Sequence, residues 1–168
     1  MKFIKYTVIF LLLYSCTRIQ QLPPVPRIEF NSFSVFDTTD ILGNSAKAGR
    51  LNFYFEDGDG DLGLDLPTGE EEDTTNIFFS LYRKTNGALE PAPANDPLQP
   101  STYRIPFMEK QGQNQILKGT ISITFLYLFY SGADTIVYDF YIKDRAQNES
   151  NTVSTNEIIL SVNGVYKK

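Results

Sequence analysis

Apolar and polar residues alternate along much of the chain after residue 27, which is the pattern of β-strands that bury one face. The alternation is clearest over 50–56, where Leu51, Phe53 and Phe55 share one face. Comparable segments cover 28–36, 76–84, 117–126, 134–143 and 153–162, with a weaker one over 102–107. Turn-forming residues lie between them, and helical periodicity is weak throughout. The pattern predicts an all-β chain.

The alternation also predicts which side chains form the core. The expected inward positions of the later segments are Ile77, Phe79, Leu81, Ile121, Ile123, Phe125, Ile136, Tyr138, Phe140, Ile142, Ile158, Leu160 and Val162. Short antiparallel strands with one apolar face each favour a Greek-key β-sandwich. Hydrophobic residues make up 42% of the chain, which is enough to fill such a core.

The first 16 residues join a basic start to a short apolar run. Lys2 and Lys5 precede an apolar run over 6–14, which is shorter than the roughly 20 residues that a membrane-spanning helix needs. This is the design of a signal peptide. The run ends in the sequence LYSC at 13–16, which resembles the lipobox of bacterial lipoproteins. The resemblance implies cleavage before Cys16 and attachment of lipid to that cysteine; an ordinary signal peptide followed by a free thiol is the alternative.

These signals divide the chain into three predicted parts: a signal peptide over 1–15, a lipidated cysteine with a Pro-rich tether over 16–27, and one folded domain over 28–168. The prolines of the tether favour an extended polyproline geometry, which would hold the domain away from the lipid surface. In lipoproteins of this kind, sorting depends on the residues after the lipidated cysteine. Neither an adjacent Asp nor an acidic cluster follows Cys16, which implies the outer membrane, with its periplasmic leaflet favoured over the cell surface.

A segment near the C-terminus carries a second resemblance. Residues 138–151 read YDFYIKDRAQNESN, which resembles the last hairpin of immunoglobulin-like and fibronectin type III-like domains. With the lipobox and the sequence DGDGDLG over 57–63, the chain resembles small Ig-like outer-membrane lipoproteins of Bacteroidota. This resemblance implies a single Ig-like antiparallel β-sandwich, and it brings no assigned activity.

The acidic loop after the strand over 50–56 is the one constellation in the sequence that is suited to bind a metal ion. Asp57, Asp59, Asp61 and Asp65 stand in the sequence DGDGDLGLD, so several carboxylates come from one short segment. Calcium prefers about six to eight oxygen ligands, and glycines let a loop turn tightly enough to supply them. The spacing does not fit an EF-hand, which needs Gly and Glu where this chain has Leu and Thr.

In an Ig-like topology, the loop before the last strand lies at the same end as this acidic loop. Asp144 and Asn148 are therefore expected near the acidic loop as further calcium ligands. The alternative is a metal-free turn, because Asp-Gly repeats form turns without any ion. Sequence spacing alone leaves both interpretations open.

Composition narrows the function by exclusion. The chain has no histidine and no tryptophan, and its only cysteine is the expected lipid site, so the mature domain lacks imidazole and thiol chemistry. A net charge of -5 argues against nucleic acid as a partner. We therefore predict a membrane-anchored, non-enzymatic module of the cell envelope that binds an envelope protein, with calcium as its candidate cofactor.

Two other functions stay open on the sequence. A carbohydrate-binding module would use an exposed aromatic residue, and Tyr103 in the long irregular stretch 85–115 is a better candidate than Tyr127 or Tyr141. A small hydrolase would need two carboxylates, one of them in an apolar pocket, and no motif in the chain marks such a pair.

Overall fold

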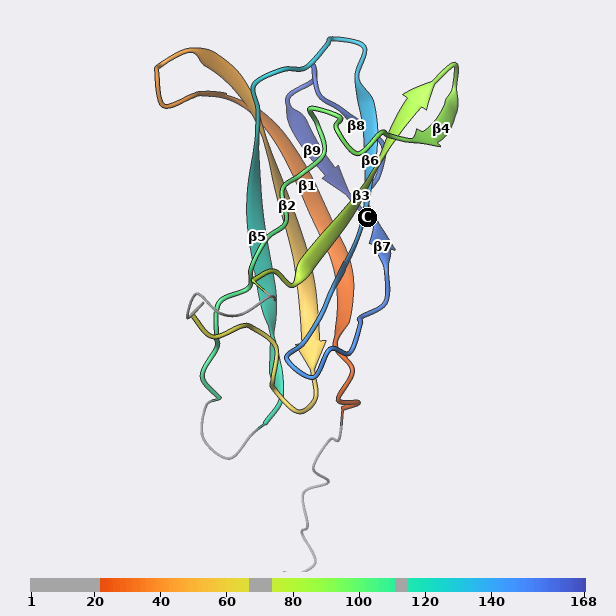
Figure 1. The fold of residues 1–168 in the computed structure, drawn as a ribbon. Helices are drawn as coiled ribbons and strands as arrows, with labels where there is room; N and C mark the ends of the chain where they lie inside the picture. The colour runs from red at the N-terminus through yellow and green to blue at the C-terminus, as the bar shows by residue number, and fades with distance from the viewer. Residues whose placement is uncertain (1–21, 67–73, 111–114) are drawn as a thin grey trace, which may run out of the picture.

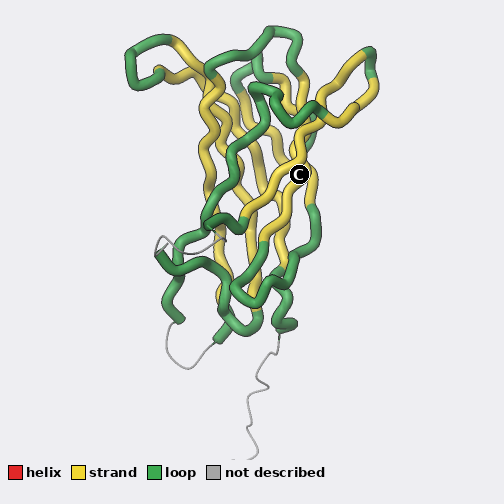
Figure 2. The backbone as a smooth tube through the Cα atoms, in the orientation of Figure 1, coloured by secondary structure: helices red, strands yellow, loops and turns green. Residues whose placement is uncertain are grey.

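The computed structural model of the protein describes residues 22–66, 74–110 and 115–168. The predicted signal peptide, Cys16 and the first part of the tether lie outside these residues. The described chain contains strands and no helix (Figures 1 and 2). The strands are β1 (Arg27–Thr39), β2 (Ser45–Asp57), β3 (Ile77–Thr85), β4 (Ala88–Pro91), β5 (Leu117–Tyr127), β6 (Thr135–Ile142), β7 (Val153–Ser154), β8 (Ile158–Ile159) and β9 (Gly164–Lys167).

The strands form two antiparallel sheets that pack face to face. One sheet has the order β5-β2-β1-β9, and the other has the order β4-β3-β6-β7, with β8 also paired to β6. Thus β1, β2 and β5 share one sheet, and β3, β6 and β7 share the other. This is the division of strands A, B and E from strands C, F and G in immunoglobulin-like sandwiches. The predicted all-β sandwich is confirmed.

The inward faces of the two sheets meet in one hydrophobic core, as the alternation predicts. Leu51 and Phe53 of β2 are completely buried. An aromatic cluster joins the sheets: Phe125 of β5 stacks on Phe33 of β1 with ring centroids 5.9 Å apart, and it meets Phe79 of β3 edge-on at 5.5 Å. Such pairs each add about 0.5–1.5 kcal/mol to the burial of their rings. The cluster fixes how the two sheets sit on one another.

The prediction of one continuous last strand is wrong. The chain instead forms the short strands β7 and β8 on β6, then turns and returns as β9 on the edge of the other sheet. At Thr155, the side-chain hydroxyl accepts the hydrogen bond from Tyr138 N–H at 3.1 Å, so no regular ladder continues there. Ile158 and Leu160 are buried as predicted, whereas Val162 lies in the turn and is 51% exposed.

The weak segment over 102–107 does not form a strand. It makes isolated bridges only, one between Tyr103 and Ile77 and one between Pro106 and Leu64. Pro106 has no N–H to donate, which prevents a continuous ladder at this position. The segment nevertheless runs along the outer edge of β3 and touches the end of the acidic loop, so it supports that loop from the side.

The two ends of the sandwich carry different features. β1 runs from the tether to its hairpin turn with β2, so the tether and this turn lie at opposite ends (Figure 1). The acidic loop follows β2 and therefore lies at the tether end. Pro26 of the tether is buried, and the carbonyl of Pro23 accepts a 3.1 Å hydrogen bond from Gly58 N–H. Residues 22–26 thus pack on the folded domain.

Candidate metal centre

Asp57 ends β2 on the inward side of that strand. The alternation that buries Phe53 and Phe55 continues by one step, so the next inward position is a carboxylate in place of a hydrophobic side chain. Asp57 has 0% of its surface exposed, and its Oδ2 accepts a 2.7 Å hydrogen bond from Leu62 N–H. Leu62 is itself completely buried and holds the loop against the core. The strand pattern therefore places a charged group inside the domain.

Asp57, Asp59 and Asp61 bring one carboxylate oxygen each to within 4.8 Å of one another. The Oδ1 atoms of all three are buried and have no hydrogen-bond partner among the residues that the structure describes. Asp59 and Asp61 are half-buried, so the cluster lies at the rim of the core. Buried polar atoms in folded proteins are normally hydrogen-bonded, and three unpaired acceptors together are an exception that needs an explanation.

Two of the clustered carboxyl groups, those of Asp57 and Asp61, have raised pKa values. Burial, with the nearby Asp59 and Asp61, raises the pKa of Asp57 to about 6. Burial also raises the pKa of Asp61, followed in effect by the charges of Asp144 and Asp59. These directions mean that the charged form of each group is disfavoured by its surroundings. The site therefore favours anything that brings compensating positive charge.

The basic side chains around the loop form hydrogen bonds to its backbone, although the charge of Arg145 partly offsets the raised pKa of Asp61. Lys110 donates to the carbonyl of Asp59 at 2.7 Å, and Arg145 donates to the carbonyl of Gly63 at 2.9 Å. Arg104 donates to two further carbonyls, those of Leu64 and Asp65. Within the described residues, none of the ion pairs involves the three clustered carboxylates. The cations hold the backbone of the loop and leave its carboxylates free of ion pairs.

Two glycines let the loop pass close to its neighbours. Gly60 has a φ of +67°, and a Cβ there would lie 1.9 Å from the carbonyl oxygen of Gln115. Gly63 has a φ of +96°, and a Cβ there would lie 2.4 Å from the carbonyl oxygen of Pro106. Both glycines have a left-handed backbone and lie close to a neighbouring carbonyl. A side chain at either position would therefore be disfavoured by the backbone conformation and by a steric clash.

The β6–β7 loop packs against the acidic loop, as the Ig-like topology predicts. Ala146 N–H donates to Asp61 Oδ2 at 3.2 Å, and Arg145 N–H donates to the Asp61 carbonyl at 3.3 Å. Asp144 is fully buried, but both of its carboxylate oxygens accept hydrogen bonds from Asn148, at 2.7 and 2.8 Å. Asp144 and Asn148 thus close their own turn beside the cluster.

The remaining predicted ligand lies apart from the cluster. Asp65 is exposed, and its carboxylate is not among the converging oxygens of the described residues. The acidic residues over 70–73 lie outside the described residues. The structure therefore brings together three of the predicted ligands, which are the three at alternate positions.

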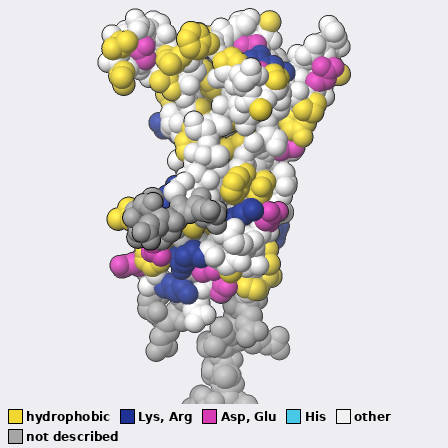
Figure 3. Space-filling model, viewed as in Figure 1, with side chains coloured by type: hydrophobic (Ala, Val, Ile, Leu, Met, Phe, Trp, Pro, Cys, Tyr) yellow, Lys and Arg dark blue, Asp and Glu magenta, His cyan; other side chains and the backbone are white. Residues whose placement is uncertain are grey.

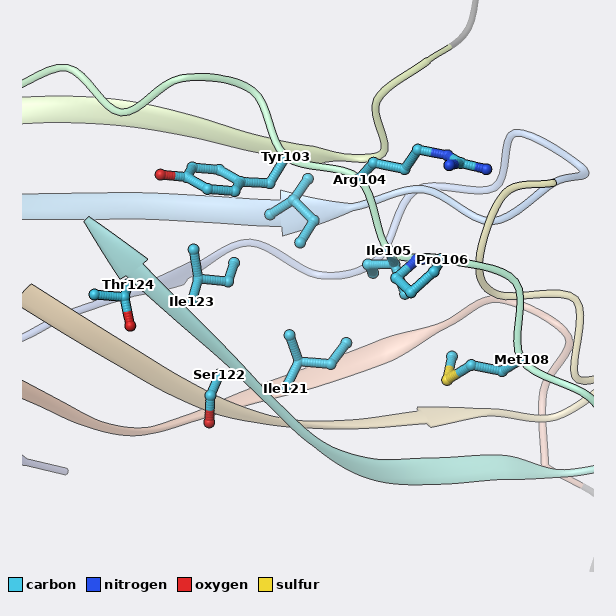
Figure 4. A pocket seen from close by; sticks show the side chains of 10 residues that line it. Tyr103, Arg104, Ile105, Pro106, Met108, Ile121, Ser122, Ile123 and Thr124 are labelled. Carbon is cyan, nitrogen blue, oxygen red and sulfur yellow. The ribbon is translucent and has the colours of Figure 1, made fainter. Parts of the chain in front are cut away.

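Tyr103 is half-buried, so the expectation of an exposed aromatic is wrong. Its ring packs edge-on against Phe79 and Phe125, with centroids 6.0 and 5.6 Å away. It lines a cavity of about 410 Å³ between β5 and the segment 103–108, into which Ile121 and Ile123 point from β5 (Figure 4). The cavity wall is mostly apolar and does not present the open aromatic face on which a sugar ring stacks.

The other aromatic candidates are engaged as well. Tyr127 is buried, and its hydroxyl lies 3.0 Å from that of Tyr138. It therefore does not present the outward-facing ring that the carbohydrate-binding hypothesis needs. Tyr141 does face outward, where it stacks on Phe78 with centroids 5.1 Å apart. Its ring is therefore covered on one side by a neighbour of its own sheet.

Two features were not predicted from the sequence: the basic residues that fix the loop, and a set of exposed apolar residues at the opposite end. Lys110 and Arg145 come from segments far away in sequence, and no local pattern links them to Asp59 or Gly63. The exposed apolar residues carry a local signal, since Ile41 and Leu42 stand between polar turn residues. They are 100% and 81% exposed.

No protein-family model, curated protein or solved structure matches this chain. Among the residues that the structure describes, no helix is long and apolar enough to cross a membrane. The function is therefore inferred from the chemistry of the site.

Proposed function

We propose that this protein is a lipid-anchored, non-enzymatic interaction domain of the cell envelope that binds Ca²⁺ through Asp57, Asp59 and Asp61. One observation carries the proposal: three carboxylates converge, and each has a buried oxygen that lacks a hydrogen-bond donor among the described residues. Three negative charges in such a place repel one another, and a divalent cation converts the repulsion into attraction.

The spacing of the oxygens suits calcium. Ca²⁺ binds oxygen at about 2.3–2.6 Å, so two of its ligands lie at most about 5 Å apart. The three carboxylate oxygens fall within 4.8 Å of one another. Mg²⁺ is usually held by one or two carboxylates with several waters, so a cluster of three protein carboxylates favours Ca²⁺. Carbonyl oxygens and water would complete its coordination.

The membrane anchor places this site near a lipid surface. Cys16 would carry the lipid, and the acidic loop lies at the end of the domain where the described chain begins (Figure 1). We propose the periplasmic leaflet of the outer membrane as the location. Conversion of Cys16 to Ala should release the protein from the membrane fraction and abolish its labelling with fatty acid; a variant that stays membrane-bound and labelled would contradict the anchor.

The opposite end of the domain supports an interaction role. Ile41 and Leu42 lie on the turn between β1 and β2, and the nearby connection from β5 to β6 exposes Leu128, Phe129 and Tyr130, with 54%, 74% and 42% of their surfaces accessible. Hydrophobic side chains are visible at this end in Figure 3. Exposed apolar groups that gather in one region commonly mark a contact surface for another protein.

Thermal unfolding with and without calcium tests the metal site. At a calcium concentration of 100 times Kd, binding adds about 2.7 kcal/mol, which raises Tm by roughly 5–10 °C for a domain of this size. Asp59→Asn should lose this shift. Asp65→Asn is a matched control in the same loop, because its side chain lies outside the cluster, and it should keep the shift. An unchanged Tm in the wild type would contradict the calcium proposal.

A further inference from the structure

The tether and the acidic loop meet at Gly58, between two of the clustered carboxylates. Gly58 N–H donates to the carbonyl of Pro23 at 3.1 Å. A Cβ at Gly58 would lie 2.2 Å from that same carbonyl oxygen and 2.4 Å from the carbonyl oxygen of Leu22. Gly58 does not adopt a left-handed conformation, so the close approach of the tether is the evident reason for a glycine here.

The tether contact extends beyond this hydrogen bond. Pro26 is buried, although its neighbours Val25 and Arg27 are exposed. β1 starts directly after it and carries the tether into the first sheet. The segment Leu22–Pro26 is therefore held at two points, through the burial of Pro26 and through the hydrogen bond between Pro23 and the acidic loop.

We propose that Ca²⁺ at Asp57, Asp59 and Asp61 locks the segment Leu22–Pro26 onto the domain, so that the cation sets how the domain stands on its anchor. This inference rests on the proposed calcium site. Gly58 lies between Asp57 and Asp59 in the chain. A cation held by both of these carboxylates therefore fixes the orientation of the Gly58 N–H, which donates its hydrogen bond to the carbonyl of Pro23. Without the cation, repulsion between the carboxylates opposes the conformation that binds the tether.

Thermodynamic linkage makes the coupling reciprocal. If calcium strengthens the docking of the tether by some factor, then the docked tether strengthens calcium binding by the same factor. A change in the tether that weakens its docking, made outside the acidic loop, must therefore weaken calcium binding. A site that merely binds calcium on a rigid loop would show no such effect.

Hydrogen–deuterium exchange on the full-length lipoprotein in detergent tests the inference. We expect calcium to slow exchange at Gly58 and at the amides of Leu22, Val25 and Arg27 by about fivefold or more, the range of ordinary coupling between sites. A calcium titration of the same sample shows whether the ion binds at all. Calcium binding without protection of these amides would overturn the inference and leave the proposed site intact, whereas absence of calcium binding would overturn both.

Two variants separate the tether from the metal ligands. Gly58→Ala keeps all three carboxylates but adds a Cβ where the tether lies, so protection of Leu22–Pro26 should be lost and calcium affinity reduced. Pro26→Ser weakens the docking from the tether side, outside the loop, and should reduce calcium affinity in the same direction. Unchanged calcium affinity in a correctly folded Pro26→Ser protein, as judged by its exchange pattern in β2 and β5, would contradict the reciprocal coupling.

Discussion

The carboxylate of Asp57 accepts a 2.7 Å hydrogen bond from the backbone N–H of Leu62, and both residues are completely buried. The bond satisfies one oxygen of Asp57 and leaves the other beside Asp59 and Asp61. It also draws Leu62 into the core and so closes the loop. The same contact thus shapes the loop and orients a buried charge toward the other carboxylates.

The effect of Asp57→Asn on the free energy of unfolding should reverse when calcium is added. In chelator, the amide removes a buried charge, so the free energy of unfolding should equal that of the wild type or exceed it by up to about 3 kcal/mol. In calcium, the variant lacks a ligand and should be the less stable protein. Urea denaturation under both conditions measures this; the same ranking in chelator and calcium would count against the site.

The stability of the metal-free protein should fall as pH rises between about 4 and 6. The pKa of Asp57 is raised in the folded state from 3.8 to about 6, so the folded protein binds more protons than the unfolded chain across this window. Loss of that proton costs about 3 kcal/mol by the time pH 7 is reached. Denaturation in chelator at pH 4.5 and pH 7 measures about 2 kcal/mol of this loss, and Asp57→Asn should show a smaller difference. Equal pH dependence in the two proteins would contradict this assignment.

Leu62→Ala should destabilise the domain strongly, because Leu62 is fully buried where the loop meets the core. Truncation of a buried leucine costs about 2–5 kcal/mol through lost burial and the cavity left behind. Leu42→Ala is the matched control, since Leu42 is 81% exposed and its truncation should change the free energy of unfolding by less than about 0.5 kcal/mol. Similar costs for the two would show that Leu62 does not pack as described.

Gly60→Ala should be more costly than Gly87→Ala, although both glycines have positive φ angles, of +67° and +84°. The backbone penalty of about 1 kcal/mol is common to both. Gly60 adds a clash, because its Cβ would meet the carbonyl of Gln115, whereas no atom of the described residues lies within 4 Å of a Cβ at Gly87. Chemical denaturation measures the loss in free energy of unfolding for each variant, and the difference between the two losses is the cost of the clash. Equal losses would argue against the packing of Gln115 on the loop.

Alternation of side chains was sufficient to predict the sandwich and the burial of most core residues. The same alternation indicates that Asp57 is buried, because this residue continues the inward series of Phe53 and Phe55. The three alternate carboxylates could be found from their spacing alone. These features depend on neighbours in the sequence, where the period of a strand directly fixes which way a side chain points.

Features that depend on distant segments could not be predicted in this way. Val162 continues an apolar alternation, yet the chain turns there because β9 pairs with the other sheet. Tyr103 lies in an irregular segment, and its burial depends on Phe79 and Phe125 from two separate strands. Asp144 and Asn148 are hydrogen-bonded to each other, whereas the sequence suggested free oxygens beside the loop. This pairing could be recognised only from the hydrogen-bond geometry.

The exposed apolar end of the domain should be needed for partner binding and dispensable for folding. A double substitution, Ile41→Ser with Leu42→Ser, removes two highly exposed side chains and should leave the free energy of unfolding within about 0.5 kcal/mol of the wild type. Chemical crosslinking in intact cells should yield a heavier product with the wild type that the variant loses. A wild type that is always recovered alone, or a variant that crosslinks equally well, would contradict the interaction surface.

The most direct test of the central claim is a calorimetric titration of the chelator-treated protein with Ca²⁺. The cluster of Asp57, Asp59 and Asp61 predicts one bound ion per chain, loss of that binding in Asp59→Asn, and retention of it in Asp65→Asn. No saturable binding by the wild type, or binding that Asp59→Asn leaves unchanged, would contradict the calcium site.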